Sequence, residues 1–305
     1  MMKDNIIKKG FRYLAARGYF NFLPDEIYLR AKYWACTGRK LNLKNPTRFN
    51  EKLQWLKIYE RKNIYSKMVD KYSAKEYVSN LIGSEYIIPT LGVWDSFDDI
   101  DFSKLPNQFV LKCTHDSGGL VICRDKKALD LSKTRAKIEK SLKKNYFFSG
   151  REWPYKNVKP RIIAEKYMED NDSQELRDYK FYCFDGIPKF LYLSQGMEKH
   201  ETARIDFLNL KWEKEPFYRE DYKRFDRIPP QPEKLDEMIE LCKKLAGGGI
   251  PFLRVDFYQI NHKVFFGELT FSPGSGFSEF VPDEWNEIIG SWITLPSKKS
   301  EEHDR

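Results

Sequence analysis

The sequence predicts an α+β fold, because helical patterns alternate along the chain with strands that pair mainly antiparallel. Runs rich in β-branched and aromatic residues recur, and the last two, at residues 252–260 and 264–271, are separated only by a short polar turn. Amphipathic segments that end at glycine lie between such runs, as expected for helices. This order is typical of an α+β protein and argues against a repeat protein or a β-sandwich.

The elements can be placed in order along the chain. Residues 1–64 read as mostly helical, and a second helical stretch, over residues 66–82, stops at Gly83. The elements that follow are strands near residues 86–94, 108–113 and 119–124, a basic helix at about 131–145, strands at 161–168 and 178–193, and a helix from Pro232 to Leu245. The hairpin of residues 252–271 completes the order, and the polar residues 297–305 are expected to form a disordered tail.

Composition indicates a globular protein and argues against a secreted, disulfide-rich or zinc-binding one. The 305 residues, 41% of them apolar, can build the core of one large domain or of two to three small ones. No run of about twenty apolar residues occurs and the start lacks the pattern of a secretory signal, so we expect a cytoplasmic protein. Five scattered cysteines and four histidines argue against a disulfide framework, a structural zinc site and a histidine-built metal centre.

The positive charge is concentrated at the N-terminus. The chain carries +8 overall, whereas residues 1–64 alone hold fifteen basic and five acidic residues. Such a region suits an anionic partner, which could be a nucleic acid, an anionic membrane surface or an acidic polysaccharide. An ordinary solvated surface is the alternative, because Phe20, Phe22, Trp34 and Trp55 lie among the charges and can belong to a core.

Two carboxylates on the last hairpin predict a metal site. If the turn centres near His262, Asp256 and Glu268 stand opposite one another, and they repel unless a cation lies between them. A divalent metal would supply that cation. Alternation predicts a polar face of Arg254, Asp256, Glu268 and Thr270, and an apolar face of Leu253, Val255, Phe257, Phe265, Leu269 and Phe271. The alternative is a charged strand face that simply meets water.

A second group of polar residues could bind phosphate. Lys112 ends a strand, and the loop of Ser117, Gly118 and Gly119 follows before the next strand begins. Backbone N–H groups in such a loop can hold phosphate oxygens, and the lysine can add its charge. Neither the P-loop nor the Rossmann fingerprint is present, and an ordinary hairpin turn is the alternative. His115 is expected to be a hydrogen-bonding loop residue.

A third segment joins two further strands. An apolar strand leads into Glu165, after which Asp178 and Lys180 share one face of the next strand. Taken alone, this pair is an ordinary ion pair on an amphipathic strand.

The order of these segments is more informative than any one of them. Uncommon strings follow one another over roughly residues 20–295: Asn50-Glu-Lys-Leu-Gln-Trp-Leu-Lys57, Asp70-Lys-Tyr72, Leu105-Pro-Asn-Gln-Phe-Val-Leu-Lys112, Gly150-Arg-Glu-Trp-Pro-Tyr155, Asp178-Tyr-Lys-Phe-Tyr182 and Glu268-Leu-Thr-Phe-Ser-Pro-Gly-Ser-Gly276. This succession resembles the ATP-grasp superfamily. It resembles most closely the TupA-like ATP-grasp family of cell-surface polysaccharide biosynthesis.

The resemblance implies a role for each candidate residue. Lys71 and Lys112 would bind the phosphates of ATP, and the loop of Ser117, Gly118 and Gly119 would close over them. The adenine slot would be lined by Glu165 and the backbone of Lys166, Tyr167 and Met168, with Asp178 near the ribose or adenine. Lys180 is a family feature without an assigned role. Asp256 and Glu268 would hold Mg²⁺, and Arg254 would steady an acyl phosphate and the tetrahedral intermediate.

One position departs from the family pattern. ATP-grasp enzymes usually carry Asn two residues after the metal-binding glutamate, where this chain has Thr270. A hydroxyl coordinates magnesium more weakly than an amide carbonyl, so the number of magnesium ions is left open.

The resemblance also implies a domain organisation and a reaction. Two α+β subdomains, residues 65–160 and 161–296, would grip ATP, next to the basic helical region of residues 1–64. The reaction would be an ATP-dependent ligation of a uronic acid of a polysaccharide precursor to an amine, with a possible peripheral contact to a membrane or a lipid-linked intermediate. A glycosyltransferase is the alternative, but its Asp-x-Asp motif finds only Asp99-Ile-Asp101 and Asp170-Asn-Asp172 in loop-like segments. A nucleic-acid-binding module is not expected, because no known binding motif is evident.

Overall fold

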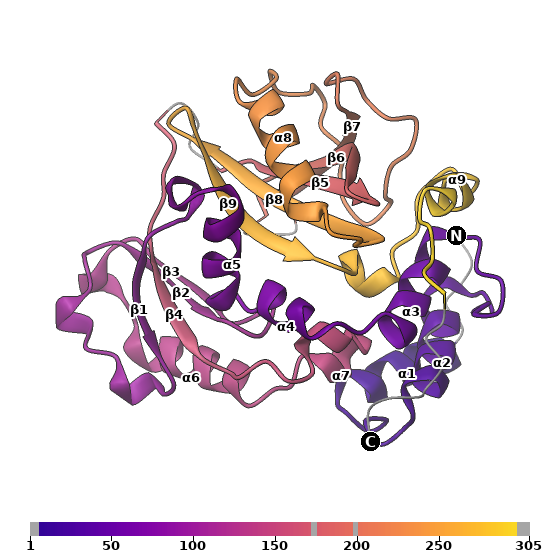
Figure 1. Ribbon diagram of the computed structural model, residues 1–305. Helices are drawn as coiled ribbons and strands as arrows, with labels where there is room; N and C mark the ends of the chain where they lie inside the picture. The colour runs from indigo at the N-terminus through magenta and orange to yellow at the C-terminus, as the bar shows by residue number, and fades with distance from the viewer. Residues whose placement is uncertain (1–5, 172–175, 198–200, 298–305) are drawn as a thin grey trace.

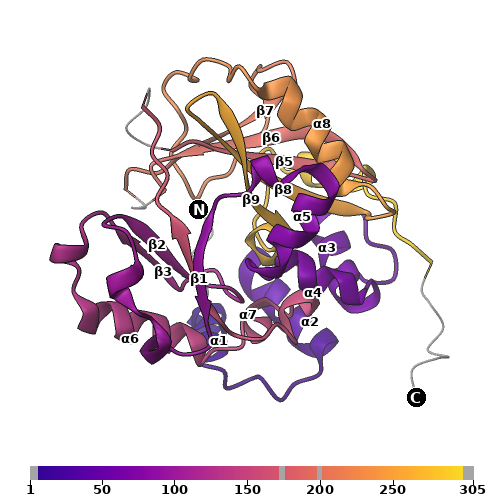
Figure 2. The same cartoon turned by 60° about the vertical axis from the view of Figure 1, so that its left-hand side comes forward.

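Two antiparallel sheets form the body of the protein. The computed structural model describes residues 6–171, 176–197 and 201–297. The first sheet has the order β1-β4-β2-β3, and the second the order β7-β6-β5-β8-β9. The strands are β1 (Thr90–Trp94), β2 (Phe109–Cys113), β3 (Leu120–Cys123), β4 (Ile162–Lys166), β5 (Asp178–Phe184), β6 (Ile187–Gln195), β7 (Arg204–Asn209), β8 (Phe252–Ile260) and β9 (Lys263–Thr270). The second sheet lies above the first in both views, and the predicted α+β class is confirmed (Figures 1 and 2).

Helices surround the sheets and form the N-terminal region. They are α1 (Ile6–Ala16), α2 (Asp25–Thr37), α3 (Phe49–Tyr59), α4 (Asn63–Val69), α5 (Ser73–Ile82), α6 (Leu131–Leu142), α7 (Phe147–Gly150), α8 (Leu235–Ala246) and α9 (Trp285–Ser291). The helical character predicted for residues 1–64 is confirmed from residue 6 onwards. Among the described residues, none of the helices combines the length and apolar character needed to cross a bilayer. Most of the predicted tail, residues 298–305, lies outside the described part of the chain.

The second sheet is buried on both faces. Side chains alternate along β5, so that Phe181 packs with α5 and α8 on one face while Tyr182 packs with α3 and α9 on the other. Both residues are almost completely inaccessible to water. This burial makes the sheet a rigid support for the polar side chains that β5, β8 and β9 contribute to the cleft.

The predicted helix over residues 66–82 is interrupted. The chain forms α4 and α5 instead, with a break at residues 70–72. The carboxylate of Asp70 accepts hydrogen bonds from the backbone N–H and the hydroxyl of Ser73, and it is paired with Arg161 at 2.7 Å. Such a side-chain contact satisfies donors at the start of a new helix, and it places Lys71 in the break.

One strand prediction and one subdomain boundary need correction. The stretch 178–193 is a hairpin, in which β5 and β6 are joined at Asp185 and Gly186, both with positive φ (47° and 83°). The second subdomain was expected to begin at residue 161, but β4 completes the first sheet by pairing with β1 and β2. The change from the first to the second sheet therefore falls after Lys166.

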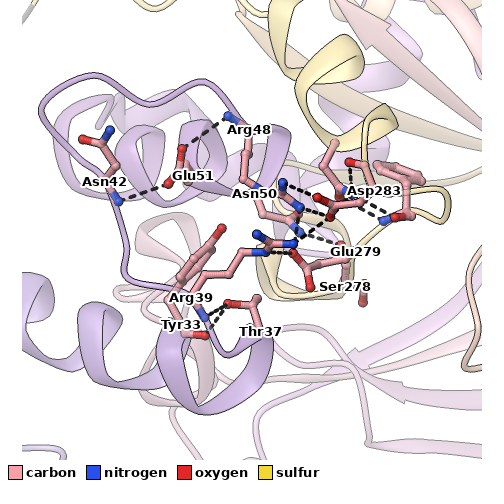
Figure 3. Close-up of polar contacts among 12 residues, drawn as sticks. Tyr33, Thr37, Arg39, Asn42, Arg48, Asn50, Glu51, Ser278, Glu279 and Asp283 are labelled. Atoms are coloured by element: carbon pink, nitrogen blue, oxygen red, sulfur yellow. Dashed lines mark hydrogen bonds and ion pairs between the residues drawn. The ribbon is translucent and has the colours of Figure 1, made fainter. Parts of the chain in front are cut away.

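A polar network ties the N-terminal region to the segment before α9 (Figure 3). The guanidinium of Arg48, which is 7% exposed, binds the carboxylate of Asp283 at 2.6 Å and that of Glu279 at 3.0 Å. Asn50 donates to the backbone carbonyl of Ser278 at 2.7 Å. These contacts join α3 to a segment more than 200 residues later, so the N-terminal helices are an integral part of the fold.

Candidate functional site

A cleft of about 340 Å³ is lined by both sheets and by the start of α5. It brings together seven of the residues predicted from the sequence: Lys71, Lys112, Ser117, Glu165, Lys180, Asp256 and Glu268. Lys112 and Glu165 come from the first sheet, whereas Asp256 and Glu268 come from the second. The structure therefore brings these distant segments together in one cleft.

A β-bulge in the β8–β9 hairpin sets the position of Glu268. Val255 pairs with Leu269 and Phe257 with Phe266, so Asp256 faces the two residues Gly267 and Glu268. A Cβ atom on Gly267 would lie 3.1 Å from the backbone oxygen of Asp256 and 3.1 Å from the ring of Tyr258, which explains the glycine. The extra residue allows Glu268 to share the cleft with Asp256.

The bulge overturns two details of the predicted hairpin. Asp256 and Glu268 are not directly opposed, because the alternation shifts by one residue at Gly267. For the same reason Phe266, at 6% exposed, is the core residue in place of Phe265. The apolar residues Leu253, Val255 and Phe257 of the opposite strand are buried as predicted.

The carboxylate of Asp256 is the centre of a buried ion cluster. Asp256 is 1% exposed. The guanidinium of Arg254 donates to both of its oxygens at 2.7 Å, and Nζ of Lys180 contacts Oδ2 at 3.1 Å. Arg254 also contacts Oε1 of Glu268 at 2.5 Å, to which the hydroxyl of Thr270 donates at 3.2 Å. The cation expected between the two carboxylates is thus supplied by Arg254, with Lys180 beside it.

The two carboxylates have different electrostatic surroundings. Burial opposes ionisation of Glu268, but Arg254, Lys180 and Lys71 together lower its pKa to about 2. Burial raises the pKa of Asp256, and the same arginine and lysine act against that effect. Because the side chain of Glu268 is 44% exposed, it presents a stable negative charge at the surface of the cleft.

A second ion cluster lies on the first sheet. Glu165, which is 5% exposed, contacts Nζ of Lys112 at 2.6 Å and Nζ of Lys75 at 2.6 Å. Burial raises the pKa of Glu165, but the two lysines outweigh it and the pKa is lowered. Lys75 was not predicted, because it lies on α5, where no sequence pattern separates a cleft lysine from a solvated one.

The loop between β2 and β3 is held in place by hydrogen bonds to Asp116 and by α6. The carboxylate of Asp116 accepts a hydrogen bond from the backbone of Gly119 at 3.1 Å and another from the hydroxyl of Ser141 on α6. A Cβ atom on Gly119 would lie 2.6 Å from Sγ of Cys113, so only glycine fits there. Nζ of Lys71 donates to the backbone carbonyl of Asp116. His115 hydrogen-bonds with the carbonyl of Lys144 at 3.0 Å, in agreement with its predicted loop role.

The remaining predicted residues are not part of the lining of the cleft. The backbone N–H of Lys166 donates to the carbonyl of Pro89, and Tyr167 and Met168 follow as half-buried residues. Asp178 is held by Lys180 at 2.9 Å and by the hydroxyl of Ser194 at 3.2 Å. The apolar part of the lining, which the sequence analysis did not predict, includes Met68, Ile87, Ile88, Leu120, Phe266 and Leu269.

A buried group next to the cleft was also missed. Lys57 donates to the backbone carbonyls of Gly150 at 2.8 Å and Ser275 at 2.6 Å, and burial lowers its pKa to about 7. The carboxylate of Glu152, which is 4% exposed, accepts a hydrogen bond from the hydroxyl of Ser275 at 2.6 Å. These residues join α3, the segment after α7 and the loop after β9.

The sequence of the chain identifies its family. The family model described as TupA-like ATPgrasp matches residues 51–294, which is well over half of the chain. The chain belongs to the TupA-like ATP-grasp family. Its cofactors are therefore ATP and Mg²⁺.

Solved structures are similar to the chain at low sequence identity. The D-alanine–D-alanine ligase from Helicobacter pylori is 16% identical, with a TM-score of 0.44 and coverage of 81% of this chain and 70% of that one. The D-alanine–D-alanine ligase from Bacillus anthracis complexed with ATP is 14% identical, with a TM-score of 0.38 and coverage of 67% and 54%. The chain thus spans about half the length of the latter enzyme. No curated protein matches the chain.

The oxygen groups at the second sheet fit a magnesium ion only in part. Within residues 6–171, 176–197 and 201–297, no group of three or more Asp, Glu, His and Cys residues could hold a metal ion. Asp256, Glu268 and Thr270 offer two carboxylates and a hydroxyl, the oxygen ligands that Mg²⁺ accepts, and the ion commonly completes its shell with water and phosphate. In this TupA-like ATP-grasp protein, Mg²⁺ at these residues would thus depend on the phosphates of ATP.

The ion cluster leads to a prediction about stability. Asp256→Asn should lower the free energy of unfolding by about 3–5 kcal/mol, because it leaves Arg254 and Lys180 without their shared buried counter-charge. Glu268→Gln should lower it by less, because this side chain is 44% exposed and Arg254 keeps Asp256 as its buried partner. Urea denaturation of both variants without nucleotide measures the difference, and equal losses of stability would contradict the assignment.

Proposed function

We propose that the chain is an ADP-forming carboxylate–amine ligase, which joins a uronic acid of a capsular or cell-wall polysaccharide precursor to an amino acid, peptide or amino alcohol. The observation that carries the proposal is the make-up of the cleft. Lys71, Lys75 and Lys112 line one side, and the carboxylates of Asp256 and Glu268 line the other. Phosphoryl transfer needs mainly positioning and charge neutralisation, which this arrangement can supply.

The reaction would proceed in two balanced steps. A carboxylate oxygen of the uronic acid attacks the γ-phosphorus of ATP, so that an acyl phosphate forms and ADP leaves. The amine then attacks the acyl carbon, inorganic phosphate leaves, and the nitrogen loses its proton. Mg²⁺ held by Asp256 and Glu268 would neutralise charge on the phosphates. Lys71 and Lys112 bind those phosphates, and Arg254 steadies the acyl phosphate.

The other candidate residues have supporting roles in this proposal. The loop of Ser117, Gly118 and Gly119 covers the phosphates, with Gly119 held by Asp116. The backbone of Lys166, Tyr167 and Met168 borders the adenine. Because Glu165 is engaged by two lysines, we assign its side chain to holding those lysines in place. Lys180 serves as a counter-charge for Asp178 and Asp256.

Glu152 is proposed to receive the amine. Its carboxylate accepts a hydrogen bond from Ser275, in the segment that follows β9, the strand that carries Glu268. Burial raises the pKa of Tyr155, and the charges of Glu152 and Glu268 add to that rise. Burial also raises the pKa of Glu152, which suits a base that accepts a proton from an ammonium group. Glu152 would pair with the ammonium form of the substrate and then take its proton.

The acidic substrate is assigned to a uronic acid by family analogy and by charge. Residues 1–64 carry ten more basic than acidic residues, which suits an anionic polysaccharide precursor or its lipid-linked carrier. The alternative of a glycosyltransferase has no support from the described residues. Asp99 and Asp101 are exposed surface residues in short turns, and Asp101 binds Ser103.

Product analysis tests the proposal directly. The protein is incubated with ATP, Mg²⁺, a uronic acid and a panel of amines, and the nucleotide and phosphate products are identified. ADP and inorganic phosphate that form only when both substrates are present would support ligation. AMP would contradict it, and UDP released from a sugar nucleotide would support the transferase.

Lys112 should be important for ATP affinity. Lys112→Ala should weaken ATP binding about 30-fold, which corresponds to about 2 kcal/mol for loss of a charge-assisted phosphate contact. Lys127→Ala is the matched control, because Lys127 is exposed, whereas Lys126 donates to two backbone carbonyls. Calorimetry measures both variants, and equal weakening would show that general basicity accounts for nucleotide binding.

Glu268 should be required for turnover. Glu268→Gln should abolish ADP formation at saturating Mg²⁺ while the protein stays folded, because the charge that holds the metal is lost. Thr270→Ser, which keeps the hydroxyl, should retain most of the activity. Near-normal ADP release by the glutamine variant would show that the metal is held elsewhere.

Glu152 should be needed mainly for amines that are protonated at neutral pH. Glu152→Gln should lower kcat/KM for an alkyl amine at least about 100-fold, because general base catalysis is lost, while ATP affinity is unchanged. Hydroxylamine, which is largely unprotonated at neutral pH, should restore much of the rate. Ser275→Ala, which removes only the hydrogen bond, should have a smaller effect. If hydroxylamine is used as poorly as the alkyl amine, Glu152 has a structural role only.

A further inference from the structure

Helix α1 presents apolar side chains to solvent on its outer face. Phe11 and Ala15 face the protein, where Phe11 stacks on Phe20 at a centroid distance of 4.9 Å. Ile6, Tyr13 and Leu14, spaced by seven and eight residues, share the opposite face and are 83%, 55% and 38% exposed. A surface helix normally buries its apolar stripe and exposes a polar one. The apolar side of α1 is therefore wider than the part that packs on the protein.

The apolar surface continues beyond the end of α1. Tyr19 is 62% exposed and Phe22 is 80% exposed, in the loop that leads to α2. These side chains with Ile6, Ile7, Tyr13 and Leu14 are called the outer patch. Helix α1 lies beside α2 at the lower edge of the helical region in Figure 1, and α2 covers only its inner side. Phe11 and Ala15 pack into the core on the inner side, whereas the side chains of the outer patch are exposed.

Positive charge lies beside the outer patch. Residues 6–22 contain four basic residues, Lys8, Lys9, Arg12 and Arg17, and no acidic residue. Lys9 and Arg17 are exposed, and the guanidinium of Arg17 stacks over the ring of Tyr13 at 4.1 Å. An exposed face of aromatic and aliphatic side chains next to basic residues is typical of helices that lie in the headgroup region of a bilayer.

We propose that the outer patch docks the protein on an anionic lipid bilayer, with α1 lying in the plane of the interface. Ile6, Ile7 and Leu14 enter the boundary between headgroups and acyl chains, whereas Tyr13, Tyr19 and Phe22 sit at the level of the headgroups. Lys9 and Arg17 contact the anionic headgroups. This docking would bring the cleft to a lipid-linked acid, and to that extent the inference rests on the proposed function.

Vesicle sedimentation tests the proposal without any enzymatic assay. Vesicles of phosphatidylcholine with phosphatidylglycerol should bind the full chain, and vesicles of phosphatidylcholine alone should bind it at least about tenfold more weakly. Lys9→Gln and Arg17→Gln should each weaken binding about fivefold. The paired change of Tyr13→Ser and Phe22→Ser should remove most of it.

Matched controls separate the outer patch from general surface properties. Lys104→Gln and Lys133→Gln remove charges from side chains that are 83% and 87% exposed, and Ile187→Ser removes an apolar side chain that is 54% exposed elsewhere. All three should bind vesicles like the unaltered protein. Equal losses in the patch variants and the controls would overturn the proposal.

A second outcome would also overturn it. Light scattering could show a dimer that dissociates when Tyr13 and Phe22 are both changed to serine. If vesicles then also bind the unaltered protein no better than that variant, the outer patch is covered by a second copy of the chain. ADP formation on soluble substrates is measured in parallel. Loss of ligation activity without loss of vesicle binding would then count against the proposed function alone.

Discussion

The buried carboxylate of Asp256 is the interaction on which the candidate site depends. It holds Arg254 by two hydrogen bonds and Lys180 by a third contact, on a sheet that is buried on both faces. Arg254 in turn holds Glu268 at the edge of the cleft. One buried negative charge therefore positions two cations and, through one of them, a second carboxylate. Such a cluster is stable only while every member has its partner.

The same principle operates across the cleft on the first sheet. Glu165 is the buried counter-ion of Lys112 and Lys75, just as Asp256 is of Arg254 and Lys180. Each sheet thus contributes a buried carboxylate that holds cations at the cleft surface. When ATP binds, its phosphates would meet lysines whose positions are already set, which reduces the entropy lost on binding. The proposed ligase function needs this preorganisation more than it needs a protein nucleophile.

The sequence indicated which residues form the site better than it indicated how they are arranged. The order of Lys71, Lys112, Asp256 and Glu268 along the chain indicated an ATP site through its resemblance to the ATP-grasp family, and the structure brings all four to one cleft. The bulge at Gly267 was not predictable from alternation, since the register depends on the paired strand. Lys75 was missed because a lysine on a helix surface has no sequence pattern that separates it from solvated lysines. The break at residues 70–72 was missed because it depends on Arg161, far along the chain.

The central claim is that the cleft forms an acyl phosphate from a carboxylate and ATP. A uronic acid labelled with ¹⁸O in its carboxylate, supplied with ATP, Mg²⁺ and an accepted amine, tests it most directly. Attack of the carboxylate on the γ-phosphorus carries one labelled oxygen into the phosphate that is released when the amide forms. The account predicts inorganic phosphate with a single ¹⁸O atom for each amide bond. Amide formation with unlabelled phosphate, or with AMP as the nucleotide product, would contradict it.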